Sequence, residues 1–136
     1  LNFDNPAVRK EIFDIGRFWL AKGVDGFRLD AAMHIFPDER GPDSVAFWKE
    51  FRAEMQKMNP DVLLVGEVWA GSEKTGAFLP ALGSVFNFEL AGAILDALKA
   101  GRGEGLAARH AEIRKRYAGA APDFIDATFL SNHDQN

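Results

Sequence analysis

Cysteine is absent from the 136 residues, so the chain can form neither a disulfide framework nor a thiolate metal site. Long apolar runs are missing as well, and no stretch approaches the length of a membrane span. A strong charge of one sign is also missing, since the formal net charge is −4 with Lys and Arg scattered among Asp and Glu. This balance gives no reason to expect nucleic acid or a membrane as a partner. The chain begins with Leu1 and shows no signal peptide, so it reads as a segment of a longer protein, and secreted and cytoplasmic locations both stay open.

Apolar residues make up 47% of the chain, which is enough to build the core of one modest domain. The apolar spacing predicts helices at 6–22, 44–59, 90–98 and 106–117, and strands at 24–29, 61–69, 84–88 and from 124 onward. A loop with Gly71, Gly76 and Pro80 is expected between the second and third strands. This alternation indicates an α/β fold with a parallel sheet.

Local signals refine these elements. Asn5, followed by a proline, is expected to cap the first helix, and Ser44 to cap the second. Trp19 and Trp48 fall on helical stripes and are expected in the core. Trp69, directly after a strand, is left open between packing and a platform for substrate.

Three of the predicted strands end in an acid, namely Asp30, Glu67 and Asp134. The carboxyl ends of parallel strands meet at one edge of a sheet, so these acids are expected to converge. Converging carboxylates suit either a magnesium or calcium ion or the nucleophile and acid of glycoside hydrolysis. Arg28, two residues before Asp30, lies on the same face of the strand. A cation there modestly favours the nucleophile over a metal, although a purely structural salt bridge is the alternative for this pair.

Three sequence motifs then become informative: GFRLD at 26–30, GEVW at 66–69 and FLSNHD at 129–134. In this order and spacing they resemble motifs of the α-amylase family of glycoside hydrolases, and residues 1–34 resemble the stretch that enters the family's fourth barrel strand. The resemblance implies a partial (β/α)8 TIM barrel, from roughly the third helix to the end of the seventh strand. Residues 1–136 would then be the central part of a single catalytic domain.

The resemblance also implies roles for six residues. The nucleophile, the general acid and base, and the third acid would be Asp30, Glu67 and Asp134. The side chains that orient the nucleophile or bind sugar hydroxyls would be Arg28, His133 and His34. One departure concerns Met33, which stands where many starch-cleaving members have lysine and which cannot donate a hydrogen bond to a sugar.

The substrate implied is a starch- or maltooligosaccharide-like α-glucan, hydrolysed with retention of configuration. A transglycosylase that uses the same intermediate and a noncatalytic partner subunit of the same family are the alternatives. A magnesium-dependent phosphoryl-transfer protein would need a phosphate loop, which GRGEG at 101–105 does not provide. No organic cofactor is implied; calcium is allowed in the full-length protein, with most ligands outside this segment. A complete barrel takes about 250 residues, so the isolated chain is expected to be inactive.

Overall fold

The computed structural model describes residues 1–135, and its centre is a single parallel sheet. The strands are β1 Gly26–Leu29, β2 Leu63–Gly66, β3 Gly83–Phe86 and β4 Ile125–Ala127. They lie in chain order, and each neighbouring pair is parallel. The predicted α/β class with a parallel sheet is therefore confirmed, and the sequential strand order is the one that a (β/α)8 barrel requires.

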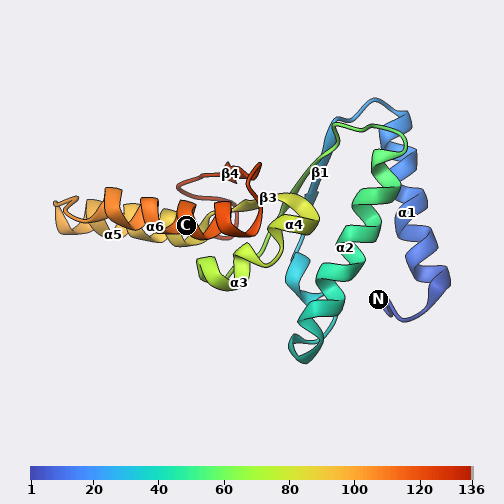
Figure 1. Ribbon diagram of the computed structural model, residues 1–136, viewed down its shortest axis with the longest axis horizontal. Helices are drawn as coiled ribbons and strands as arrows, with labels where there is room; N and C mark the ends of the chain where they lie inside the picture. Colours follow the sequence, from blue (N-terminus) through green and yellow to red (C-terminus); the bar gives the residue numbers. More distant parts are fainter. Residues whose placement is uncertain (136) are drawn as a thin grey trace.

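Helices flank the sheet at both ends of the molecule (Figure 1). They are α1 Pro6–Ala21, α2 Gly41–Gln56, α3 Ser72–Gly76, α4 Leu79–Leu82, α5 Phe88–Ala100 and α6 Leu106–Ala120, with 3-10 turns η1 Ala32–His34 and η2 Asp38–Arg40. Helices α1 and α2 pack side by side next to β1, whereas α5 and α6 form an arm at the other end. No helix within residues 1–135 is both long and apolar enough to cross a membrane.

The two predicted helix caps have different outcomes. The side chain of Asn5 accepts a hydrogen bond from the Ala7 N–H at 2.9 Å, which confirms it as the cap of α1. The prediction for Ser44 is wrong, because α2 begins at Gly41 with Pro42 in its first turn. Proline needs no N–H partner in a first turn, so the helix starts one turn earlier than expected. Ser44 is buried instead, and its hydroxyl accepts the Phe36 N–H at 3.3 Å.

The strands are shorter than the sequence predicts, and the loop expected at 70–83 is wrong because it contains α3 and α4. The side chain of Asn87 accepts the Leu90 N–H at 3.0 Å and caps α5, so Phe88 belongs to the helix rather than to β3. Pro80, which the sequence places in the expected loop, lies in the first turn of α4. Gly83 ends α4 with φ at +80°, a conformation that glycine adopts without strain.

The core between the sheet and α2 is rich in aromatic rings, and only one of the two predicted tryptophans belongs to it. Trp48 is buried and donates its indole N–H to the Ala32 carbonyl oxygen at 2.7 Å, as expected. The expectation for Trp19 is wrong, because its side chain is 49% exposed. Gly16 is the buried residue of α1, and it lies so close to α2 that a Cβ there would be 2.5 Å from the Met55 sulfur.

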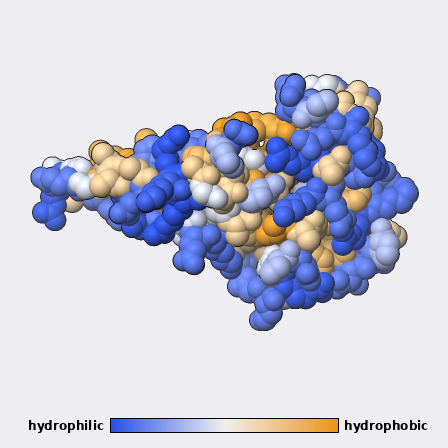
Figure 2. Space-filling model, in the orientation of Figure 1, coloured by the Kyte–Doolittle hydropathy of each residue, from blue (hydrophilic) through white to orange (hydrophobic). Residues whose placement is uncertain are grey.

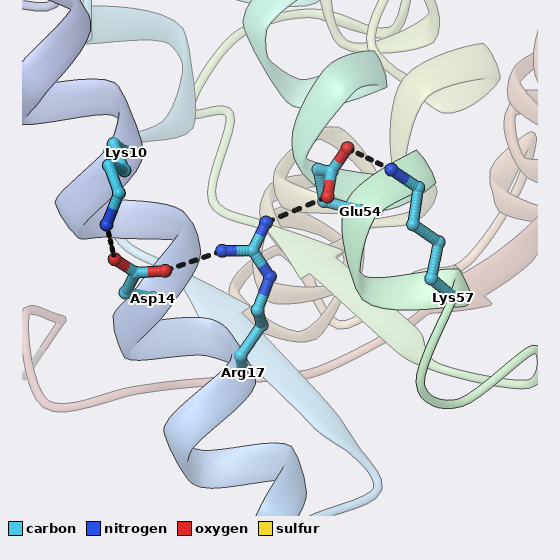
Figure 3. Close-up of polar contacts among 5 residues, drawn as sticks. All are labelled: Lys10, Asp14, Arg17, Glu54 and Lys57. Atoms are coloured by element: carbon cyan, nitrogen blue, oxygen red, sulfur yellow. Dashed lines mark hydrogen bonds and ion pairs between the residues drawn. The ribbon is translucent and has the colours of Figure 1, made fainter.

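A chain of ion pairs joins the outer faces of α1 and α2 (Figure 3). Lys10 and Arg17 bind Asp14 within α1, and Lys57 binds Glu54 at the end of α2. The link between the two helices is the 2.8 Å contact from Arg17 to Glu54. Exposed pairs of this kind stabilise a fold by at most about 1 kcal/mol each, so they orient the helices while the apolar core holds them together.

Part of the surface is strongly apolar. Figure 2 shows it at the upper middle of the view, between the α5–α6 arm and the α1–α2 end. Large apolar side chains from two strands, Leu63 and Ile125, are among those exposed. An apolar sheet left uncovered by residues 1–135 agrees with the expectation of a partial barrel.

The closest backbone approach in the sheet gives a stability prediction. A Cβ added at Gly26 would overlap the carbonyl oxygen of Leu63 in the neighbouring strand. Backbone atoms in a ladder cannot move aside, so Gly26→Ala is expected to lower the free energy of unfolding by about 3 kcal/mol or more. Gly92→Ala on α5 is the matched control, because nothing lies within 4 Å of its Cβ. It should be neutral or stabilising by up to about 1 kcal/mol, and urea unfolding of both variants measures the difference.

Candidate active site

The ends of β1 and β2 place two acids next to each other. The last paired residues of these strands are Leu29 and Gly66, and the next residues are Asp30 and Glu67. The Glu67 N–H donates to the Leu29 carbonyl oxygen at 2.9 Å, and the Ala32 N–H donates to the Glu67 carbonyl oxygen at 2.9 Å. Backbone hydrogen bonds therefore fix both acids on the edge where the sequence predicts convergence.

Arg28 joins these two carboxylates. Its Nη1 contacts the Asp30 Oδ1, as expected for residues two apart in a strand, and its Nη2 lies 2.5 Å from the Glu67 Oε2. The second contact was not predicted, since it depends on the strand register. The Ala31 N–H also donates to the same Oε2 at 3.1 Å. Every hydrogen bond to this carboxylate within residues 1–135 ends on Oε2, and none ends on Oε1.

The two acids differ in environment. The Asp30 side chain is 79% exposed, whereas that of Glu67 is only 11% exposed. Ala31 between them has φ at +43°, the one positive φ of a non-glycine residue within 1–135. Such a conformation costs on the order of 1–3 kcal/mol and persists where the surroundings enforce it. Here it turns the chain directly after Asp30 and aims the Ala31 N–H at Glu67.

The segment after β4 returns to the same edge of the sheet. His133 lines a pocket of about 330 Å³ together with Arg28, and the other lining residues are Phe86, Phe129, Ser131 and Asn132. The His133 Nε2 lies 3.2 Å from the Asp134 Oδ2, and both side chains are exposed. Among the described residues, no ion pair or hydrogen bond joins Asp134 to Asp30 or Glu67. The structure thus places His133 in the same pocket as Arg28, and Asp134 lies beside His133.

His34 lies in the 3-10 turn η1 after β1, and within residues 1–135 no ion pair or hydrogen bond joins its side chain to Asp30 or Glu67. Its Nδ1 lies 3.6 Å from the Asp38 Oδ1, and the side chain is exposed. Its neighbour Met33 is buried and, with Val45 and Phe78, lines a separate apolar pocket of about 470 Å³. Met33 therefore forms part of a hydrophobic wall and does not stand in for a polar contact to a sugar.

The packing reading of Trp69 is confirmed, and its use as a platform for substrate stays a prediction. One face of its indole stacks on Phe88, with ring centres 4.9 Å apart and planes at 10°. The residue is nevertheless 53% exposed, two positions after Glu67. A packed ring with an exposed half is a rigid surface on which a sugar ring can stack.

No group of three His, Asp or Glu side chains within residues 1–135 lies close enough to hold a metal ion. Calcium elsewhere in a longer protein stays a prediction.

Two other sequence features lie outside this site. His110 lies on α6 with its Nε2 3.4 Å from the Asp126 Oδ2 on β4. In GRGEG, Gly101 ends α5 with φ at +63° and Gly105 precedes α6 with φ at +84°. This segment connects two helices and has no strand before it, so it is not a phosphate loop.

Comparison with known proteins agrees with the motifs. The family model described as alpha amylase, catalytic domain, matches residues 1–136. Alpha-amylase 3 of Dictyoglomus thermophilum is 44% identical over 135 residues, which cover 99% of this chain and 27% of that protein. The alpha-amylase SusG of Bacteroides thetaiotaomicron is 30% identical, with 98% of this chain and 20% of that protein covered.

Solved structures give the same result. An alpha-amylase from H. orenii superposes with a TM-score of 0.90 at 42% identity, covering 100% of this chain and 28% of that one. Amy13B of Eubacterium rectale gives a TM-score of 0.86 at 27% identity, covering 98% and 28%. The chain thus spans about a quarter of the length of these relatives. On the matched family model and these superpositions, the chain belongs to the α-amylase family, and its parallel sheet is part of that family's (β/α)8 barrel.

Proposed function

We propose that this chain forms the central part of the catalytic domain of a retaining glycosidase that acts on α-glucosidic bonds of starch or maltooligosaccharides. The observation that carries the proposal is the pair of acids, one exposed and one buried, that Arg28 joins at the ends of adjacent strands. Two carboxylates in unlike environments are the arrangement that a nucleophile and a general acid need.

The proposed reaction has two displacements. The Asp30 carboxylate attacks the anomeric carbon while Glu67 protonates the departing glycosidic oxygen, which breaks the bond to the leaving sugar and forms a covalent glycosyl ester. Glu67, now ionised, takes a proton from water as the water attacks the ester, which restores both acids. Arg28 holds the Asp30 carboxylate in one orientation, and its contact with Glu67 stabilises the ionised form that exists between the two steps.

Roles for the remaining residues belong to the same proposal. Asp134 and His133 would bind sugar hydroxyls from the segment beside Arg28, and His34 would lie on the leaving-group side. The substrate would be an α-glucan in each case. Support comes from relatives named as alpha-amylases and from the maltose complex of a cyclic maltosyl-maltose hydrolase of Arthrobacter globiformis, with a TM-score of 0.79 and 27% identity.

Product stereochemistry tests the proposal. A catalytic domain that contains these residues is given a maltooligosaccharide, and NMR follows the anomeric signals before mutarotation. The α-anomer should appear first, because two displacements restore the starting configuration. A β-anomer appearing first would contradict the mechanism, and the absence of turnover would favour a noncatalytic family member.

Glucosyl transfer is a second candidate that uses the same intermediate. A 4-alpha-glucanotransferase of Thermotoga neapolitana is 29% identical over the whole of this chain, which covers 28% of that protein. Longer oligosaccharides appearing together with shorter ones in the same experiment would identify transfer.

A further inference from the structure

A polar cluster away from the paired acids joins the third and fourth strands to α6. We call it the Asp126 cluster, and its members are Asp126 on β4, Asn87 directly after β3 and His110 on α6. The Asn87 side-chain amide donates to the Asp126 Oδ1 at 2.9 Å, and the His110 Nε2 lies 3.4 Å from the Asp126 Oδ2. Asn87 is fully buried, and the Asp126 side chain is only 7% exposed. None of the proposed catalytic steps uses these groups.

The Asp126 carboxylate is tied to these two contacts. Within residues 1–135, neither its Oδ2 nor the His110 Nε2 makes a hydrogen bond or another ion pair, and both atoms are covered from solvent. A covered carboxylate that loses its polar contacts is costly, so the cluster resists any shift that separates its members. Replacing buried ion pairs by apolar residues is often neutral or stabilising. Stability alone therefore does not account for the cluster.

Asn87 connects the cluster to the start of α5. Its side-chain oxygen accepts the Leu90 N–H at 3.0 Å and caps the helix, while its backbone N–H donates to the Ala127 carbonyl oxygen at 3.0 Å. One side chain thus binds Asp126 and the first turn of α5 at the same time. Phe88 is the first residue of that helix, so the place of its ring depends on where Asn87 is held.

Phe88 lies at the centre of an aromatic cluster that reaches the candidate active site. Its ring stacks on the half-exposed Trp69 with centres 4.9 Å apart, and Phe129 packs against it edge to face, also at 4.9 Å. Phe129 in turn lines the pocket that contains Arg28 and His133. A series of ring contacts therefore leads from α5 to the site. A shift of Phe88 would move both the exposed indole and one wall of that pocket.

We propose that Asp126 is a positioning residue, which keeps the face of Trp69 and the Phe129 wall of the pocket in the arrangement that binds a sugar. It acts through Asn87, because its own side chain is almost entirely covered. This inference rests on the proposed function, since the sugar belongs to the same α-glucan. Loss of the contact between Asp126 and Asn87 should weaken sugar binding and leave the chemical step at the paired acids nearly unchanged.

Exchange of the two partners tests this role in a catalytic domain that contains the chain. Asn87→Asp keeps the helix cap, because Asp caps as well as Asn, but it removes the amide donor and places a second carboxylate against Asp126. It should raise KM for maltoheptaose about tenfold, the loss expected for one aromatic contact, with kcat changed by less than about twofold. Adding Asp126→Asn exchanges amide and carboxylate, so the hydrogen bond forms in the opposite direction and KM should return most of the way to its original value.

Ile113→Ala is the control for a purely structural role. Ile113 is a buried apolar residue on the same helix as His110, and it has no polar side-chain atom to contribute to the cluster. A variant that is only less stable has fewer active molecules, which lowers the apparent kcat at unchanged KM, and Ile113→Ala should show this pattern. The same pattern in Asn87→Asp, or a KM that stays high in the folded double variant, would overturn the proposal.

Two further measurements keep the outcome decisive. If melting curves show that Asn87→Asp does not fold, Asn87→Ser takes its place, because serine also caps helices and removes the amide without adding a charge; an unchanged KM would then refute the positioning role. Calorimetry compares maltoheptaose binding by Asp30→Ala with and without the change at Asn87. Binding about tenfold weaker supports the role even where turnover is absent, and equal binding refutes it. Absence of binding by Asp30→Ala itself would count against the proposed function, and this inference would fall with it.

Discussion

Asp30→Ala is expected to lower kcat/KM on an aryl maltooligosaccharide by about 10⁴-fold or more, the scale seen when a catalytic nucleophile is removed. Asp30 is 79% exposed at the end of β1, so it can reach a bound sugar, and its loss leaves no buried cavity. The fold should therefore survive the change. Initial rates of aryl release measure the effect, and the melting temperature reports on folding.

Adding azide to the Asp30→Ala variant tests whether Asp30 acts as the nucleophile. With the carboxylate absent, azide can enter the vacated space and attack the anomeric carbon of a substrate with a good leaving group. That single displacement inverts the configuration, so the product should be a β-glycosyl azide. Asp25→Ala is the control, because Asp25 is also exposed but precedes β1 at its other end, and it should retain activity. Equal activity in Asp30→Ala and wild type would remove Asp30 from the mechanism.

The sequence predicts the fold class because its signals are local. Asn5 caps α1 as expected, and the alternation of strands and helices yields a parallel sheet. The errors occur where a residue type has two structural uses. Pro42 and Pro80 lie in the first turns of α2 and α4, although the apolar spacing predicts that both lie outside helices. Trp19 lies on a helical stripe, but the close approach of Gly16 to α2 decides which face is buried.

The candidate site also has features that the sequence can predict and features that it cannot. That Asp30 and Glu67 lie side by side follows from strands ending in acids, so sequence alone could predict it. The contact of Arg28 with Glu67 could not be predicted, because it requires the register of β1 against β2. Nor could the contact of Arg109 with Glu89, since these residues are 20 positions apart on separate helices and meet only because α5 and α6 pack together.

Glu67→Gln is expected to show an effect that depends on the leaving group. Glutamine keeps the size of the side chain but cannot donate a carboxylic proton, so kcat/KM on an unactivated maltooligosaccharide should fall by about 10³-fold, within the range for general acid catalysis. Fluoride leaves without full protonation, so the first step with an α-maltosyl fluoride should be nearly unaffected. The glycosyl ester should then accumulate, because water also lacks its general base. A burst of fluoride release followed by a slow phase measures both consequences.

The same variant distinguishes catalysis from a structural role for Glu67. The side chain is mostly buried and binds Arg28 and the Ala31 N–H, so its replacement could also disturb the edge of the sheet. A structural defect would lower activity on both substrates equally, and azide would not restore it. If Glu67 is the acid and base, azide should instead accelerate the slow phase and yield an α-glycosyl azide, because the anion needs no base to attack the ester from the free face. Glu104→Gln, an exposed change between α5 and α6, should behave like wild type and shows that loss of one carboxylate alone is not the cause.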